Sequence, residues 1–136
     1  MGEGGTVLVA EDDRDQREIL SEVLEYEGFK VITAASPKQL VERLTPEIDL
    51  VLLDVNGVHA PEVDAALGRL GRNRPSILVV SGDCRAEDAA NAMAAQGWLA
   101  KPYELGDLLR KIGELITGRG RRLRVLDGGL GFAPAL

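Results

Sequence analysis

Five polar residues stand where short apolar runs of the sequence end: Asp12, Asp13, Asp54, Ser81 and Lys101. Neighbouring carboxylates repel one another unless a cation neutralises them, and carboxylate oxygens are ligands that Mg²⁺ prefers. An aspartate beside Mg²⁺ can attack phosphorus and form an aspartyl phosphate. The Lys101 ammonium could pair with one phosphoryl oxygen, and the Ser81 hydroxyl could donate to another. These residue types indicate phosphoryl chemistry at a magnesium site, provided that the fold brings them together.

The apolar runs before these residues are too short for helices. Leu50–Leu53 has no polar alternation and contains a β-branched residue, which is typical of a strand buried on both faces. Comparable runs are Thr6–Ala10, Phe29–Thr33, Ile77–Val80 and Trp98–Ala100. In a parallel sheet, ligands bind outside the carboxyl ends of the strands. Each polar residue taken alone is more often a helix cap or a solvated surface residue, but their coincidence at one sheet edge favours a site.

Stretches with helical spacing of apolar residues follow each predicted strand. Ser36 and Pro37 are typical of a helix start, and Asp13 could cap the first helix. Gly28 stands where the first helix should end, and Gly118 where the last should end. Five alternating strands and helices predict an α/β fold, a doubly wound five-stranded parallel sheet covered by helices on both faces.

The length of 136 residues and the ordinary composition of the chain predict a single folded domain. We expect an N-terminal extension over residues 1–5, the domain over 6–117, and a flexible tail rich in glycine and arginine over 118–136. The net charge of −6 argues against direct nucleic-acid binding and suits a cation site or a basic partner. No apolar run is long enough to span a bilayer, and the start does not resemble a signal peptide. The single cysteine, Cys84, fits a reducing cytoplasm.

The order and type of these residues resemble the receiver domain of bacterial two-component response regulators, the CheY-like superfamily. Four segments carry the resemblance: Val7–Asp13, Asp49–Asp54, Ile77–Gly82 and Trp98–Tyr103. It covers about Thr6 to Ile116 and implies the flavodoxin-like strand order 2-1-3-4-5.

The resemblance also implies a role for each site residue. Asp54 corresponds to the phosphoacceptor, and Lys101 to the lysine that pairs with the phosphoryl group. Asp12 and Asp13 correspond to the acidic pair that binds Mg²⁺ together with Asp54 and the backbone carbonyl of Asn56. Two further positions correspond to the family's switch residues, namely Ser81 for the hydroxyl and Trp98 for the aromatic residue.

The function implied is that of a signalling switch and not of a metabolic enzyme. A histidine kinase or phosphotransfer protein would supply the phosphoryl group, and the domain itself would catalyse transfer and dephosphorylation. The fourth helix, fifth strand and fifth helix would form the output surface and could support a homodimer. We expect a stand-alone receiver or a receiver cut from a larger protein, located in the cytoplasm, without direct nucleic-acid binding.

Two departures from the family pattern leave an alternative open. The segment 57–61 lacks the usual Met-Pro pair, and Trp98 replaces the usual Tyr or Phe. Both favour a receiver-like interaction module that signals without phosphorylation, whereas the complete acidic site argues against it. An aspartyl-phosphate hydrolase would need a second aspartate where Asn56 stands. A flavin carrier would need a phosphate-binding loop where Glu11, Asp12 and Asp13 would instead repel a phosphate.

Overall fold

The structure, a computed structural model, describes residues 4–82 and 86–128, with side chains up to residue 118. Cys84, most of the predicted N-terminal extension and residues 129–136 lie outside the described residues. The strands are β1 (Thr6–Ala10), β2 (Lys30–Ala34), β3 (Leu50–Asp54), β4 (Ser76–Ser81) and β5 (Gly97–Ala100). The predicted strands are therefore confirmed, with boundaries that differ by at most one residue.

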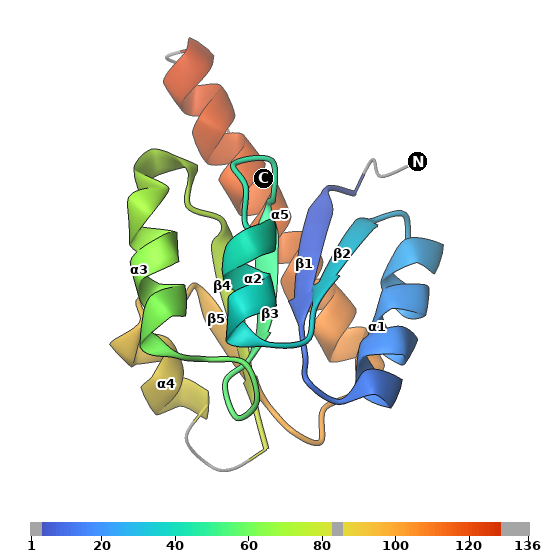
Figure 1. Cartoon of the computed structure of the whole chain (residues 1–136). Helices are drawn as coiled ribbons and strands as arrows, with labels where there is room; N and C mark the ends of the chain where they lie inside the picture. Colours follow the sequence, from blue (N-terminus) through green and yellow to red (C-terminus); the bar gives the residue numbers. More distant parts are fainter. Residues whose placement is uncertain (1–3, 83–85, 129–136) are drawn as a thin grey trace.

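The five strands form one parallel sheet in the order β2-β1-β3-β4-β5, which confirms the predicted fold and strand order (Figure 1). In the central pair, Val9 of β1 lies opposite Leu52 of β3, and Ala10 lies opposite Leu53. All strands run in one direction, so their carboxyl ends meet at one edge of the sheet. The residues that follow β1 and end β3 are thereby brought together.

The helices are α1 (Arg14–Tyr26), α2 (Pro37–Arg43), α3 (Pro61–Arg69), α4 (Ala86–Ala92) and α5 (Leu105–Gly128). A short 3₁₀ turn, Gly71–Asn73, follows α3. The Ser36 side chain accepts a hydrogen bond from the Gln39 amide, and prolines occupy the first position of α2 and of α3. These starts are the ones that capping residues and proline predict.

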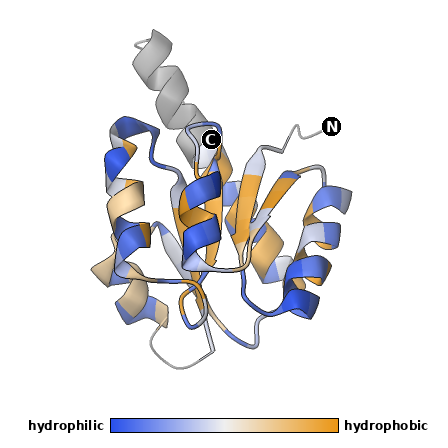
Figure 2. Cartoon of the chain, viewed as in Figure 1, coloured by the Kyte–Doolittle hydropathy of each residue, from blue (hydrophilic) through white to orange (hydrophobic). Residues whose placement is uncertain are grey.

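Helices pack on both faces of the sheet and give the domain two apolar layers. Leu20 and Leu24 of α1 pack with Leu108 and Ile112 of α5 on one face. The other face is covered by Leu40 of α2, Val63 and Leu67 of α3, Ala90 of α4, and Met93 just after α4. The hydropathy colouring shows the same division, with apolar strands inside and polar helix surfaces outside (Figure 2).

The prediction that Gly118 ends the last helix was wrong, because α5 continues to Gly128. One glycine costs a helix interior only about 1 kcal/mol relative to alanine, and the leucine and arginine residues that follow are good helix formers. Among the described residues, no helix is both long and apolar enough to span a membrane.

Candidate functional site

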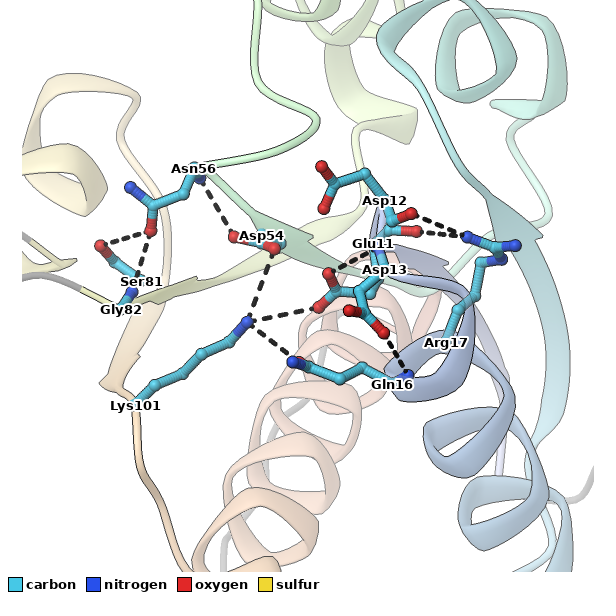
Figure 3. A network of polar contacts seen from close by, with 10 residues as sticks. All are labelled: Glu11, Asp12, Asp13, Gln16, Arg17, Asp54, Asn56, Ser81, Gly82 and Lys101. Atoms are coloured by element: carbon cyan, nitrogen blue, oxygen red, sulfur yellow. Dashed lines mark hydrogen bonds and ion pairs between the residues drawn. The ribbon is translucent and has the colours of Figure 1, made fainter.

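Side-chain alternation places Glu11 and Asp54 on the same face of the sheet. Glu11 continues β1 and follows Val9 by two residues, while Asp54 follows Leu52 of β3 by two. Because Val9 and Leu52 are opposite each other, Glu11 and Asp54 meet at the carboxyl edge (Figure 3). Both are buried, with 3% and 6% of their surface exposed.

Three carboxylates converge at this edge, those of Glu11, Asp12 and Asp54. One oxygen of each lies within 4.8 Å of the others, close enough to share one cation. Asp13 is not in this group, because its Oδ1 accepts the Gln16 amide at 2.9 Å and caps α1. A set of hard oxygen donors, two of them buried, fits Mg²⁺. The assignment of Asp13 as a ligand stays a prediction, and the geometry favours Glu11 in its place.

Glu11 is the carboxyl group most perturbed by this crowding. Its pKa is raised from 4.5 to about 7, chiefly by burial and in addition by a hydrogen bond with Asp54 and by the Asp54 charge. The backbone amide of Asp13 donates to Glu11 Oε2 at 3.1 Å and opposes the shift. Two buried carboxylates side by side are unfavourable unless a proton or a cation neutralises one of them.

Lys101 supplies the positive charge opposite these carboxylates. Its Nζ lies 3.1 Å from Gln16 Oε1, 3.4 Å from Glu11 Oε1 and 3.5 Å from Asp54 Oδ2. Burial lowers the pKa of Lys101, but the charges of Asp54 and Glu11 outweigh burial and raise the pKa above its ordinary value. The ammonium therefore remains charged beside Asp54.

Asn56 connects Asp54 with the end of β4. Its backbone amide donates to Asp54 Oδ1 at 3.0 Å. Its side-chain Oδ1 accepts from the Ser81 hydroxyl at 3.0 Å and from the Gly82 amide at 2.9 Å (Figure 3). The carboxamide of Asn56 thus holds the Ser81 hydroxyl near the acidic edge.

Two contacts position the loop between β1 and α1. Arg17 Nη1 donates to the backbone carbonyl of Glu11 at 2.9 Å and to that of Asp12 at 3.4 Å. The Asp12 carboxylate lies directly over Gly57, where a Cβ atom would overlap it. The unusual glycine after Asn56 therefore provides the space that Asp12 occupies.

This arrangement joins a partly shielded aspartate, a group of cation ligands, a fixed ammonium and a hydroxyl at one sheet edge. Comparison with known proteins identifies the architecture. Residues 7–113 match the family described as "Response regulator receiver domain". The chain belongs to this family. Receiver domains are the signalling switches of two-component response regulators.

A curated relative and two solved structures show the extent of the similarity. The transcriptional regulatory protein PdtaR of Mycobacterium tuberculosis is 30% identical over 126 residues, which are 90% of this chain and 61% of PdtaR. The chain thus spans about three fifths of that relative's length.

CheY6 of R. sphaeroides, solved with the P1 domain of CheA3, superposes with a TM-score of 0.71 at 24% identity, over 85% of this chain and 99% of the matched chain. TrrA of Thermotoga maritima, solved with Mg(2+)-BeF, has a TM-score of 0.66 at 22% identity, over 82% and 98%. At these identities the two structures support the receiver fold alone.

The receiver domain brings most of the predicted site residues together. Asp12, Asp54, Asn56, Ser81 and Lys101 surround the acidic edge (Figure 3). Trp98 lies apart from this group on β5, opposite Val79 of β4, and is 41% exposed.

Three residues of the network were not predicted from the sequence: Glu11, Gln16 and Arg17. For Glu11 a signal was present. The two-residue period of β1 extends from Val9 to Glu11, as that of β3 extends from Leu52 to Asp54. The two helical residues contact the site through long side chains, which spacing alone does not place.

In the part of the chain that the structure describes, an open cleft and an apolar groove lie beside the acidic edge and share Gln16 and Tyr103. The open cleft of about 460 Å³ is lined by Gln16, Gly82, Lys101, Pro102 and Tyr103. The more apolar groove of about 260 Å³ is lined by Gln16, Ile19, Leu20, Val23, Tyr103 and Leu105. Burial raises the pKa of Tyr103, so its phenol stays neutral.

Proposed function

We propose that Asp54 accepts a phosphoryl group from a phosphohistidine of a partner protein, with Mg²⁺ bound. The observation that carries this proposal is the setting of the Asp54 carboxylate. It is fixed at the end of β3 with the Lys101 ammonium 3.5 Å from Oδ2 and the carboxylates of Glu11 and Asp12 beside it. An aspartate used only to end a strand needs neither the ammonium nor the acidic group.

In the proposed transfer, a carboxylate oxygen of Asp54 forms a bond to phosphorus. The bond from phosphorus to the histidine nitrogen breaks, and that nitrogen keeps the electron pair and takes a proton from water. The Lys101 ammonium lies where it can pair with a phosphoryl oxygen, and the Ser81 hydroxyl can donate to another. Water attack on the same phosphorus would return Asp54, so the domain acts as a self-resetting switch.

The cation ligands we propose are the carboxylates of Glu11, Asp12 and Asp54, joined by the backbone carbonyl of Asn56 as the resemblance implies. Mg²⁺, when bound, neutralises phosphoryl and carboxylate charge. Arg17 keeps the loop of Glu11 and Asp12 in place through their carbonyls. In this assignment Asp13 serves the α1 cap and stays outside the metal site.

The phosphodonor is proposed to dock on the apolar groove between α1 and the segment after β5. Ile19 is 61% exposed and Leu105 is 45% exposed there, an unusual exposure for large apolar side chains. The groove adjoins the cleft that contains Lys101, and both share Gln16 and Tyr103. A histidine kinase or phosphotransfer domain seated on this face would have its histidine near Asp54. The structurally similar CheY6 was solved in complex with another protein domain, the P1 domain of CheA3.

The readout is proposed to involve Ser81 and Trp98. A phosphoryl group on Asp54 would attract the Ser81 hydroxyl away from Asn56, and the changed end of β4 would bias the surface of α4, β5 and α5, where Trp98 is exposed. That surface is also where we place a homodimer contact or an effector protein. We also propose a cytoplasmic location, in line with the family resemblance.

Titration with beryllofluoride and Mg²⁺ tests the proposal, because this complex imitates a phosphoryl group on aspartate. Trp98 is the chain's single tryptophan, so its fluorescence reports on the proposed output surface. We expect a saturable fluorescence change in the wild type that requires Mg²⁺ and is absent in Asp54→Asn. If the Trp98 fluorescence does not change and calorimetry detects no binding of beryllofluoride, a phosphorylation-independent interaction module would be supported instead.

A further inference from the structure

The shortest contact of the Lys101 ammonium is with a neutral side chain. Nζ lies 3.1 Å from the carboxamide oxygen of Gln16, but 3.4 Å and 3.5 Å from the carboxylates of Glu11 and Asp54. Hydrogen bonds between an ammonium and a carboxylate are usually about 2.7–2.9 Å long. The ammonium therefore stops short of both negative groups, although their charges attract it.

Gln16 is placed to produce this offset. It lies in the first turn of α1, and its backbone amide is fixed by Asp13 Oδ1 at 2.9 Å. Its side chain lines the open cleft together with Lys101, and none of the three carboxylates of the acidic group lines that cleft. Figure 3 shows the Gln16 carboxamide reaching the Lys101 ammonium below Glu11. This contact ties Nζ to a residue of the cleft.

We propose that Gln16 is a positioning residue that keeps the Lys101 ammonium from closing onto the carboxylates of the cation site. An ammonium seated among Glu11, Asp12 and Asp54 would neutralise the same oxygens that a divalent cation needs. Binding of the cation would then require its displacement, and cation affinity would fall. By holding Lys101 at the cleft, Gln16 leaves the acidic group free for the cation and the ammonium free for a phosphoryl oxygen. The inference rests on the proposed magnesium site.

Mg²⁺ affinity measured by calorimetry at fixed ionic strength tests it. Gln16 is exposed, so its substitution should not unfold the domain. Gln16→Leu removes the acceptor at similar size, and we expect Mg²⁺ to bind about fivefold more weakly, the effect of one net hydrogen bond. Gln16→Glu keeps an acceptor oxygen for the ammonium and should bind Mg²⁺ at least as tightly as the wild type.

The same substitution in a Lys101→Met background separates the proposed role from a direct one. With no ammonium to restrain, Gln16→Leu should leave Mg²⁺ affinity unchanged. An equal loss in that background would overturn the inference, since Gln16 would then act on the cation without Lys101. Wild-type affinity in Gln16→Leu would overturn it as well. Absence of Mg²⁺ binding by the wild type would instead contradict the magnesium part of the proposed function.

Discussion

The carboxamide oxygen of Asn56 accepts hydrogen bonds from the Ser81 hydroxyl at 3.0 Å and from the next backbone amide, that of Gly82, at 2.9 Å. Asn56 follows β3 and Ser81 ends β4, so one side chain joins the two strand ends nearest Asp54. In our account the Ser81 hydroxyl must leave this oxygen to reach a phosphoryl group. The contact with Asn56 therefore favours the unphosphorylated arrangement.

Asn56→Ala should make the activated arrangement easier to reach. Loss of the contact with Ser81 removes about 1 kcal/mol that favours the resting state, so beryllofluoride should bind about fivefold more tightly. Fluorescence titration of Trp98 measures this affinity. In a Ser81→Ala background the substitution should have no such effect, and weaker binding in the single variant would show that Asn56 instead supports the activated state.

Without metal, stability should fall as the pH rises through neutrality. The pKa of Glu11 is raised from 4.5 to about 7 in the folded protein, so the folded state binds more protons than the unfolded chain between these values. The stabilising contribution is complete below pH 4.5 and is lost as the pH passes about 7. The free energy of unfolding, measured with urea in the presence of a chelator, should fall by up to about 3 kcal/mol across this pH range.

Glu11→Gln is the control for this pH dependence. It keeps the size of the side chain and removes its titration, so this part of the pH dependence should disappear. Mg²⁺ should restore the stability of the wild type above neutral pH, because it can replace the proton that Glu11 loses. A wild type and a Glu11→Gln variant with the same pH profile would contradict the assigned role of Glu11.

Gly57→Ala should weaken Mg²⁺ binding by displacing Asp12. A Cβ atom at this position overlaps the Asp12 carboxylate, so the carboxylate must leave the group that it forms with Glu11 and Asp54. We expect a loss of about tenfold in affinity, in line with about 1.4 kcal/mol for one displaced ligand. Calorimetry measures it.

Gly68→Ala is a matched control for that substitution. Gly68 lies within α3, and a Cβ atom there meets nothing within 4 Å. Alanine at this site should leave Mg²⁺ affinity unchanged and raise stability by about 0.5–1 kcal/mol, because glycine is the poorer helix former. Equal Mg²⁺ affinities in both glycine variants would contradict the placement of Asp12.

The sheet could be predicted from the sequence because each strand is a short apolar run ended by a polar or turn residue. Alternation with helices then determines a parallel arrangement, and the strand order came from the family resemblance. Because parallel strands have their carboxyl ends at one edge of the sheet, Asp54, Ser81 and Lys101 could be predicted to lie at the same edge. Their local contacts follow from the fold because strand ends leave few alternatives.

The site ligands were harder to assign, because Glu11, Asp12 and Asp13 are adjacent and chemically alike. Their roles depend on where β1 ends and α1 begins, a boundary that sequence patterns place only within a residue or two. A shift of one residue moves a side chain to the other face. The contacts of Gln16 and Arg17 could not be predicted, since long side chains choose among many rotamers only when their partners are present.

Intact-mass measurement after incubation with acetyl phosphate and Mg²⁺ tests the central claim most directly. We predict the addition of one phosphoryl group to the wild type, with none in Asp54→Asn and none when a chelator removes Mg²⁺. The adduct should be lost in base, as expected for an acyl phosphate. Equal phosphorylation of the wild type and Asp54→Asn, or a base-stable adduct, would contradict the assignment of Asp54 as the phosphoacceptor.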